Sequence, residues 1–286
     1  MKNILITGIN GQLGSEMRLL ASQHNDYCYF FTDIAELDIC NEKAVRDFVK
    51  SNDIDVIVNC AAFTAVDKAE DEPEFCDRLN HLAVGNLARA IESRQGYLIQ
   101  ISTDYVFDGT AHIPYTEYRS TCPASVYGAM KLKGEEIAME CCSHTMVVRT
   151  AWLYSTFGSN FVKTMIRLGC ERASLGVVFD QIGTPAYARD LAEAICVAIE
   201  KRITPGVYHF TDEGVCFWYD FTKMIHMQAG ISGCTVNPLH SSDYPTRALR
   251  PHYSVLDKTK IKRTYNIEIP HWMESLKACI DELKAV

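Results

Sequence analysis

The stretch Thr7-Gly8-Ile9-Asn10-Gly11-Gln12-Leu13-Gly14 follows directly on the apolar run Asn3-Ile4-Leu5-Ile6. Glycines at every third position permit a tight turn and let a ligand approach the backbone closely. Residues 12–23 then have the pattern of a helix, whose free N–H groups and positive dipole end would face that turn. We therefore predict a strand, a turn and a helix that bind a dinucleotide diphosphate at Gly8, Gly11 and Gly14. A plain strand-to-helix turn is the alternative.

Strand-like and helix-like segments alternate through most of the chain. The strand-like runs are residues 3–7, 27–32, 56–60, 97–102, 146–150 and 206–210. The helix-like segments are residues 12–23, 42–52, 73–94, 125–140 and 189–201. Such alternation is typical of a parallel sheet covered by helices on both faces. The expected fold class is α/β, a doubly wound parallel sheet of the Rossmann type with a smaller C-terminal substrate-binding lobe.

The pattern also suggests how the chain divides. Residues 152–183 and 213–286 are richer in turns and aromatic side chains, and we expect them to form mainly the smaller lobe. Residues 1–151 would form the dinucleotide-binding domain, to which residues 184–212 return. This division follows because consecutive segments tend to pack as neighbours.

Composition excludes several classes of protein. The 286 residues carry 28 Lys and Arg against 36 Asp and Glu, a formal net charge of -8, which argues against a nucleic-acid partner. No apolar run has the length of a membrane span and no signal-peptide pattern precedes the first strand, so we expect a cytoplasmic protein without a membrane partner. The twelve cysteines include no Cys-x-x-Cys pair and are expected to be buried thiols.

Asp33 stands at the end of the second strand-like run. A carboxylate there accepts hydrogen bonds from the adenosine ribose and repels a 2′-phosphate. No Arg or Lys lies between Asp33 and Asn41, so we favour NADH over NADPH, with either allowed. Asp38 and Ile39 would lie against the adenine, or Asp38 would cap the helix that starts near residue 42.

Hydroxyl and carboxyl side chains end the fourth strand-like run as Ser102-Thr103-Asp104. The carboxyl ends of parallel strands are where open α/β sheets bind ligands. The small residues Ala61 and Ala62 follow the third run at the same edge. They suit a backbone that lies close to a dinucleotide, with plain tight packing as the alternative.

Tyr127 and Lys131 have a Tyr-x-x-x-Lys spacing, which puts both side chains on one face of a helix. A phenol titrates near about pH 10, so Lys131 is expected to lower the pKa of Tyr127 and to hold the ribose of a nicotinamide. A surface Tyr–Lys pair is the alternative. Together with the glycine turn and Thr103, the spacing predicts a site at which Tyr127 transfers a proton.

Longer motifs carry a resemblance to a known family. They are residues 61–70 (AAFTAVDKAE), 102–107 (STDYVF), 149–152 (RTAW), 180–185 (DQIGTP), 244–246 (YPT) and 250–251 (RP). On these motifs the chain resembles the extended short-chain dehydrogenase/reductases, and more narrowly the dTDP-4-dehydrorhamnose reductase family, over nearly its whole length. The resemblance implies NADH- or NADPH-dependent reduction of the C4 keto group of dTDP-4-dehydro-6-deoxy-L-mannose to dTDP-L-rhamnose.

The resemblance also implies roles for single residues. The catalytic residues would be Thr103, Tyr127 and Lys131. The dinucleotide would contact Gly11, Gln12, Leu13, Asp38, Ile39, Ala62 and Thr64, and the sugar would contact Val66, Thr103, Asp104 and Trp152. Arg250, and less so Arg247, would bind the diphosphate of the substrate, unless each pairs with a surface carboxylate.

Two other functions stay open. The chain could be another NAD(P)-dependent nucleotide-sugar epimerase, dehydratase or ketoreductase, or a non-catalytic regulatory subunit of the same fold. The complete Thr103, Tyr127 and Lys131 set argues against the second. Some family members are described as dimers bridged by magnesium through acidic side chains; Glu16 fits one such position, but Arg189 stands where another acid is expected. We therefore expect no metal and a monomer or weak homodimer.

Overall fold

The computed structural model describes residues 2–23 and 26–285. Its centre is a six-stranded sheet in the order β10-β5-β4-β3-β1-β2, with every neighbouring pair parallel. The strands are β1 (Lys2–Thr7), β2 (Tyr27–Thr32), β3 (Val56–Asn59), β4 (Tyr97–Thr103), β5 (Thr145–Thr150) and β10 (Gly206–His209). The strand order reverses between β1 and β3, the position at which such sheets bind ligands. The expected α/β fold with a Rossmann-type sheet is confirmed.

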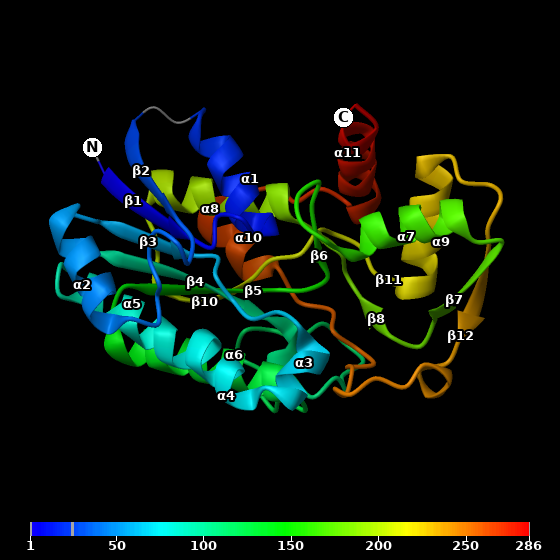
Figure 1. The fold of residues 1–286 in the computed structure, drawn as a ribbon, viewed down its shortest axis with the longest axis horizontal. Helices are drawn as coiled ribbons and strands as arrows, with labels where there is room; N and C mark the ends of the chain where they lie inside the picture. Colours follow the sequence, from blue (N-terminus) through cyan, green and yellow to red (C-terminus); the bar gives the residue numbers. More distant parts are fainter. Residues whose placement is uncertain (1, 24–25, 286) are drawn as a thin grey trace.

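Helices cover both faces of this sheet (Figure 1). One face is covered by α1 (Gln12–Ala21), α8 (Ala188–Lys201) and α10 (Thr259–Tyr265). The other is covered by α2 (Glu42–Ser51), α5 (Ala83–Glu92) and α6 (Val126–Cys141). Alternate strand residues serve the two faces: Ile4 and Ile6 pack with the first set and Leu5 with the second. The strands are almost wholly apolar because both of their faces are buried.

A separate hydrophobic cluster lies beside the sheet, on the right of Figure 1. It contains α7 (Phe161–Glu171), α9 (Trp218–Ala229), α11 (Trp272–Ala285), and β7 (Ser174–Val178) paired with β12 (Thr235–Leu239). Short ladders join β6 (Leu153–Tyr154) to β9 (Ala186–Tyr187) and β8 (Ile182–Gly183) to β11 (Cys216–Phe217). A 3-10 turn, η3 (Ser241–Asp243), follows β12.

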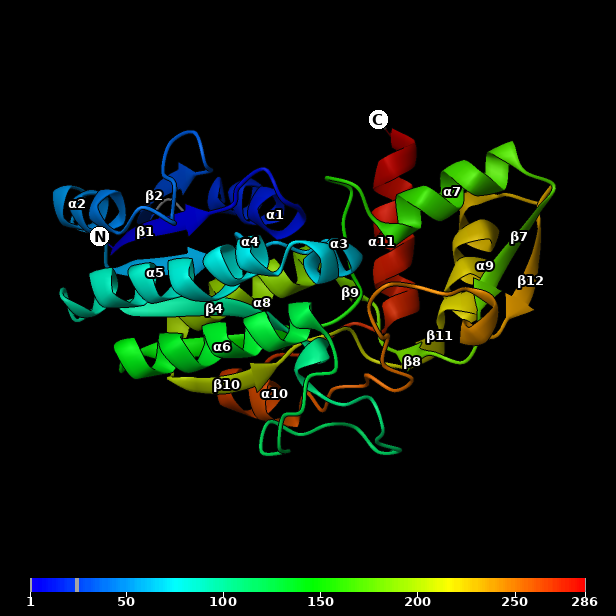
Figure 2. The same cartoon turned by 60° about the horizontal axis from the view of Figure 1, so that its bottom comes forward.

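The C-terminal residues serve both parts of the molecule. Figures 1 and 2 show α11 standing between the sheet and the rest of that hydrophobic cluster, which is called the α7–α9 cluster below. In contrast, Ile261 and Tyr265 of α10 pack into the core of the sheet. The last third of the chain is therefore shared between the two cores.

Two local features differ from the expected pattern. Residues of the 61–70 motif form a short helix, α3 (Val66–Asp71). The long helix expected over residues 73–94 is instead α4 (Pro73–Asp77), a π-helical turn η1 (Arg78–Leu82), and α5. A π-helical turn inserts one residue and changes the direction of the side chains that follow, which apolar periodicity alone does not reveal.

All twelve cysteines are free thiols. Five are buried, but Cys122 and Cys170 are exposed, so the expectation of uniformly buried thiols is wrong for these two. Cys122 lies in the loop before α6 and Cys170 on the outer side of α7. Within residues 2–23 and 26–285, no helix has both the length and the apolar character that crossing a bilayer requires.

Candidate active site

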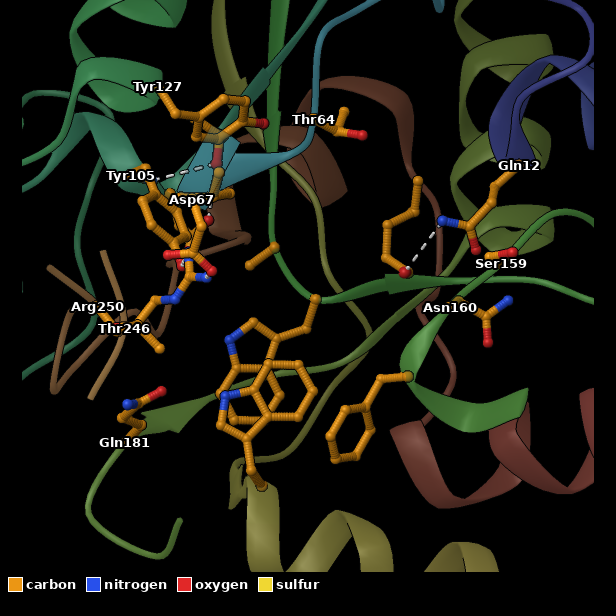
Figure 3. A pocket seen from close by; sticks show the side chains of 18 of the residues that line it. Gln12, Thr64, Asp67, Tyr105, Tyr127, Ser159, Asn160, Gln181, Thr246 and Arg250 are labelled. Atoms are coloured by element: carbon orange, nitrogen blue, oxygen red, sulfur yellow. Dashed lines mark hydrogen bonds and ion pairs between the residues drawn. The ribbon is translucent and has the colours of Figure 1, made fainter. Parts of the chain in front are cut away.

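A cleft of about 1270 Å³ opens at the carboxyl edge of the sheet, beside the α7–α9 cluster (Figure 3). It is lined by the glycine turn, residues 60–66, the ends of β4 and β5, α6, the start of α7, β7, and residues 244–251, here called the strap. This volume is larger than a site for one drug-sized ligand, so a dinucleotide and a second ligand can share it.

Most of the residues predicted to form a site come together in this cleft. Those that line it are Gly11, Gln12, Leu13, Ala61, Ala62, Thr64, Val66, Thr103, Asp104, Tyr127, Lys131, Trp152, Arg247 and Arg250. Gly8, Gly14, Asp33, Asp38 and Ile39 lie outside its lining. The structure therefore brings residues from four strand ends, from α6 and from the C-terminal third to one place.

The glycine turn has no room for side chains. A Cβ on Gly8, whose φ is +67°, would lie 2.6 Å from the backbone nitrogen of Ala61, and a Cβ on Gly14 would lie 2.2 Å from the carbonyl oxygen of Gly8. Helix α1 starts after Gly11 without a capping side chain, so its first N–H groups are open to an anion. The turn fits a dinucleotide diphosphate. Gly8 and Gly14 allow the close backbone contacts within the turn, and Gly11 lines the cleft.

Asp33 lies one residue beyond β2 and holds the glycine turn. Its Oδ2 accepts the N–H of Asn10 at 3.1 Å, and its Oδ1 accepts the N–H of Ile34 at 2.8 Å. The backbone N–H of Asp33 donates to Glu36 at 2.8 Å. Two carboxylates thus stand together beside the turn, an arrangement that opposes a 2′-phosphate.

Asp38 and Ile39 have other partners. Asp38 Oδ1 accepts the N–H of Cys40 at 2.9 Å, whereas the cap of α2 is Asn41. The capping alternative for Asp38 is therefore wrong. Ile39 is buried in the core between the sheet and α2, so its side chain contributes to packing.

Asn80, in the π-helical turn, fixes the loop that carries Ala61, Ala62 and Thr64. Its Oδ1 accepts the N–H of Phe63 at 2.8 Å, and its Nδ2 donates to the carbonyl of Phe63 at 2.9 Å. Asn80 is not among the residues predicted from the sequence. A buried asparagine inside an apolar helical pattern was the available signal, because such a side chain needs partners outside its helix.

Tyr127 projects from the first turn of α6 into the cleft (Figure 3). The helix starts close against η2 (Asp104–Val106): a Cβ on Gly128 would lie 2.2 Å from the carbonyl oxygen of Tyr105. Burial raises the pKa of the Tyr127 phenol, and a hydrogen bond with Thr103 only partly opposes that shift. The expectation of a lowered phenol pKa is therefore wrong for the protein without ligands, because desolvation outweighs every favourable contact.

Lys131 lies one helical turn beyond Tyr127 and is also buried. Its ammonium donates to the carbonyl of Ile101 at 2.6 Å, which secures the end of β4 to α6. Burial lowers the pKa of Lys131 to about 8, against the opposing charge of Glu135. With a raised phenol pKa, Tyr127 stays protonated at neutral pH, as a proton donor must.

A buried ion pair holds α6, the helix that carries Tyr127 and Lys131, against the sheet. Arg149 on β5 donates to Glu135 on α6 at 2.6 Å, and their side chains are 5% and 1% exposed. Ser102 on β4 donates to the same carboxylate. One acid therefore joins two strands to the helix that carries Tyr127 and Lys131.

Aromatic side chains form the opposite end of the cleft. Trp152, at a φ of +48°, stacks on Trp218 of α9, and Phe161 of α7 contacts Trp218 at a centroid distance of 4.4 Å. Trp218 and Phe161 were not expected from the sequence. They belong to segments that meet Trp152 only through the tertiary fold.

The two strap arginines pair with acids on α3. Arg250 donates to Asp67 at 2.6 Å and to the hydroxyl of Tyr105 at 3.2 Å, and Arg247 pairs with Asp71. Pairing with a carboxylate, the alternative considered for these arginines, is thus present for both. Arg250 uses two of its five N–H donors in these contacts, so it keeps donors for an anion in the cleft.

Glu16, which fits the position of a bridging acid in metal-linked family members, is paired inside the chain. Glu16 is buried, accepts from Arg189 at 3.0 Å, and accepts from Ser155 at 2.6 Å. Arg189 also pairs with Glu282 on α11. Among the described residues, no group of three or more His, Cys, Asp or Glu is arranged to hold a metal ion.

The profile of the RmlD substrate binding domain matches residues 1–285. The chain belongs to this family. It is 39% identical to the dTDP-4-dehydrorhamnose reductase of Escherichia coli (strain K12), over 98% of each chain.

Solved structures agree with this RmlD family assignment. A dTDP-4-dehydrorhamnose reductase from Clostridium acetobutylicum ATCC 824 superposes with a TM-score of 0.95 at 42% identity, over 99% of each chain. The enzyme from Bacillus anthracis str. Ames in complex with NADP superposes with a TM-score of 0.94 at 37% identity, over 99% of this chain and 100% of that one. The resemblance inferred from the motifs is confirmed.

Proposed function

We propose that the protein reduces the C4 keto group of dTDP-4-dehydro-6-deoxy-L-mannose with NADH or NADPH, giving dTDP-L-rhamnose. The observation that carries the proposal is the placement of Tyr127, Thr103 and Lys131 in the cleft that the glycine turn opens. Relatives with this name match the chain almost end to end. Residues 1–151 and 184–212 would bind the dinucleotide, and residues 152–183 and 213–286 mainly the nucleotide sugar.

The proposed catalytic step divides among the three residues. A bound reduced nicotinamide supplies the hydride for the carbonyl carbon. Tyr127 donates its phenolic proton to the oxygen that becomes the C4 hydroxyl, and Thr103 hydrogen-bonds to that oxygen. Lys131 orients the dinucleotide ribose and keeps a positive charge behind the phenol, which stabilises the phenolate left after proton transfer.

The remaining predicted residues would hold the two ligands. The first N–H groups of α1, with Gly11, Gln12 and Leu13, would hold the diphosphate of the dinucleotide, which passes along Ala61, Ala62 and Thr64. Val66, Asp104 and Trp152 would contact the sugar, and Arg250 the substrate diphosphate. Asp33 supports a preference for NADH, because its carboxylate stands with Glu36 beside the turn.

We also propose that the protein acts in the cytoplasm as a monomer or weak homodimer. The support for the first part is its substrate, a nucleotide sugar reduced by a soluble coenzyme. The support for a monomer or weak homodimer is the ion pair between Glu16 and Arg189. Because Arg189 already balances the charge of Glu16, this carboxylate is not available to bind a bridging metal ion.

The test is to supply dTDP-4-dehydro-L-rhamnose with each reduced nicotinamide and to follow coenzyme oxidation. Net oxidation distinguishes a reductase from an epimerase or dehydratase, which regenerates its coenzyme, and from a binding subunit, which does not turn over. Tyr127→Phe should lower the rate by roughly 10²-fold or more. An unchanged rate would exclude Tyr127 as the proton donor.

A further inference from the structure

The Thr103 hydroxyl, at the centre of the site, has its only proton already engaged. Its oxygen accepts the N–H of Tyr105 at 3.2 Å, and its proton is donated to Asp104 Oδ1 at 2.9 Å. A hydroxyl has one proton and two acceptor positions. One acceptor position of Thr103 therefore stays open, in the same cleft as the Tyr127 phenol.

This arrangement points the Thr103 proton away from a ligand. The hydrogen bond runs from Thr103 to Asp104, so the Thr103 hydroxyl is not directed at a carbonyl oxygen in the cleft. An ionised Asp104 enforces that direction, because a carboxylate only accepts hydrogen bonds. A reductase that protonates a ketone oxygen needs the opposite arrangement.

Asp104 stands in surroundings that favour its neutral form. Its side chain is 3% exposed, and its Oδ2 is buried without a hydrogen-bond partner among the described residues. The titratable groups that face it are Tyr127 of α6 and Tyr105 of its own turn, and Ser254 faces it from the C-terminal segment. None of these is a cation, so an ionised Asp104 would be a buried and uncompensated charge.

We propose that the competent form of this site contains Asp104 as a neutral acid that donates its proton to the Thr103 oxygen. The Asp104 proton and the Tyr105 N–H then fill both acceptor positions of Thr103. The Thr103 proton is then released for a carbonyl oxygen, and Thr103 has no acceptor position left for the Tyr127 proton. Asp104 thereby acts through Thr103 as a positioning residue, and this inference rests on the proposed function.

The proton count of the reaction is unchanged by this arrangement. Tyr127 loses one proton to the new hydroxyl group of the product and regains one from solvent before the next turnover. Asp104 keeps its own proton throughout. What Asp104 determines is the direction in which the Thr103 hydroxyl donates.

The inference predicts a specific pH profile. Burial raises the pKa of Asp104 to about 6, with the Thr103 and Ser254 hydroxyls opposing the shift. The neutral form is active, so kcat/KM should be level below this pKa and fall about tenfold per pH unit above it. The pKa of Lys131, at about 8, and that of Tyr105, at about 12, lie above this range.

Asp104→Asn tests the profile, because an amide of the same shape does not titrate. The fall in kcat/KM from about pH 6 to about pH 7.5 should disappear in this variant, whatever its absolute rate. Thr103→Val should lose the same fall, since Asp104 acts through Thr103. Asp108→Asn is the matched control: Asp108 lies four residues further on, outside the cleft lining and bound to Tyr115, and its variant should keep the wild-type profile.

A second measurement does not depend on turnover. Infrared difference spectra should show loss of a carboxylic acid C=O band as the wild-type protein is taken through about pH 6, and the part of this band that comes from Asp104 should be missing from Asp104→Asn. It would remain observable if the substrate proposal failed. A wild-type profile without the fall, a fall that Asp104→Asn retains, or the same infrared band in both proteins would each overturn the inference.

Discussion

Trp152 lies flat against Trp218, with ring centroids 3.5 Å apart and an angle of 10° between the rings. Trp152 adopts the left-handed backbone region at a φ of +48°, which costs a residue with a large side chain about 1 kcal/mol or more. Gly183 lies so close that a Cβ there would be 2.6 Å from the Trp152 ring. The stack, and not local backbone preference, therefore holds Trp152 at the end of the cleft.

Replacing Trp218 with leucine should weaken binding of the nucleotide sugar without changing coenzyme affinity. Loss of an aromatic pair costs about 0.5–1.5 kcal/mol beyond the lost burial, so KM should rise roughly two- to tenfold or more. Trp218→Phe keeps an aromatic ring, so its KM should lie between those of the wild type and Trp218→Leu. Steady-state kinetics with saturating coenzyme measure the effect, and an unchanged KM for Trp218→Leu would contradict it.

A methyl group on Gly14 should disrupt the glycine turn. Alanine is the better helix former by about 1 kcal/mol, but its Cβ would lie 2.2 Å from a backbone oxygen that cannot rotate away. Overpacking of this kind costs about 1–3 kcal/mol, and coenzyme binding should be lost with it. Gly233→Ala is the control, since nothing lies within 4 Å of a Cβ there. Thermal unfolding and coenzyme titration would show equal behaviour of the two variants if the prediction were wrong.

The effects of replacing Glu135 and Arg149 on the free energy of unfolding should be strongly non-additive. Arg149→Met leaves the buried Glu135 carboxylate without its cation and should destabilise the protein by about 3–5 kcal/mol. Adding Glu135→Leu removes that charge and should recover much of the loss. Denaturant unfolding of the single and double variants measures this. Additive losses would mean that the pair does not interact as the geometry indicates.

Coenzyme preference should respond to Asp33. Asp33→Ser removes one of the two carboxylates beside the turn, so the ratio of kcat/KM for NADPH over NADH should rise, by roughly tenfold for a gain of about 1.4 kcal/mol. Glu36→Gln keeps an acceptor for the Asp33 N–H and should shift the ratio less. If Asp33→Ser lowers both kcat/KM values equally, the carboxylate serves only the hydrogen bond to Asn10.

The sequence alone was sufficient for the sheet, for the glycine turn and for placing Tyr127 and Lys131 on one helix face. Apolar alternation defines the strands because both faces of the sheet are buried, and Tyr127 and Lys131 share a helix face because their spacing matches one turn. These are local relations, which neighbouring residues along the chain already specify.

Other properties of the site were decided by the tertiary structure. Asn80 reaches Phe63, Trp218 reaches Trp152, and Arg250 reaches Asp67 across separations that no periodicity encodes. The pKa of Tyr127 rises although the motif predicted a fall, because the balance between desolvation and nearby charge depends on what surrounds the phenol in three dimensions. Sequence therefore determined which groups are present, and packing determined their partners and protonation.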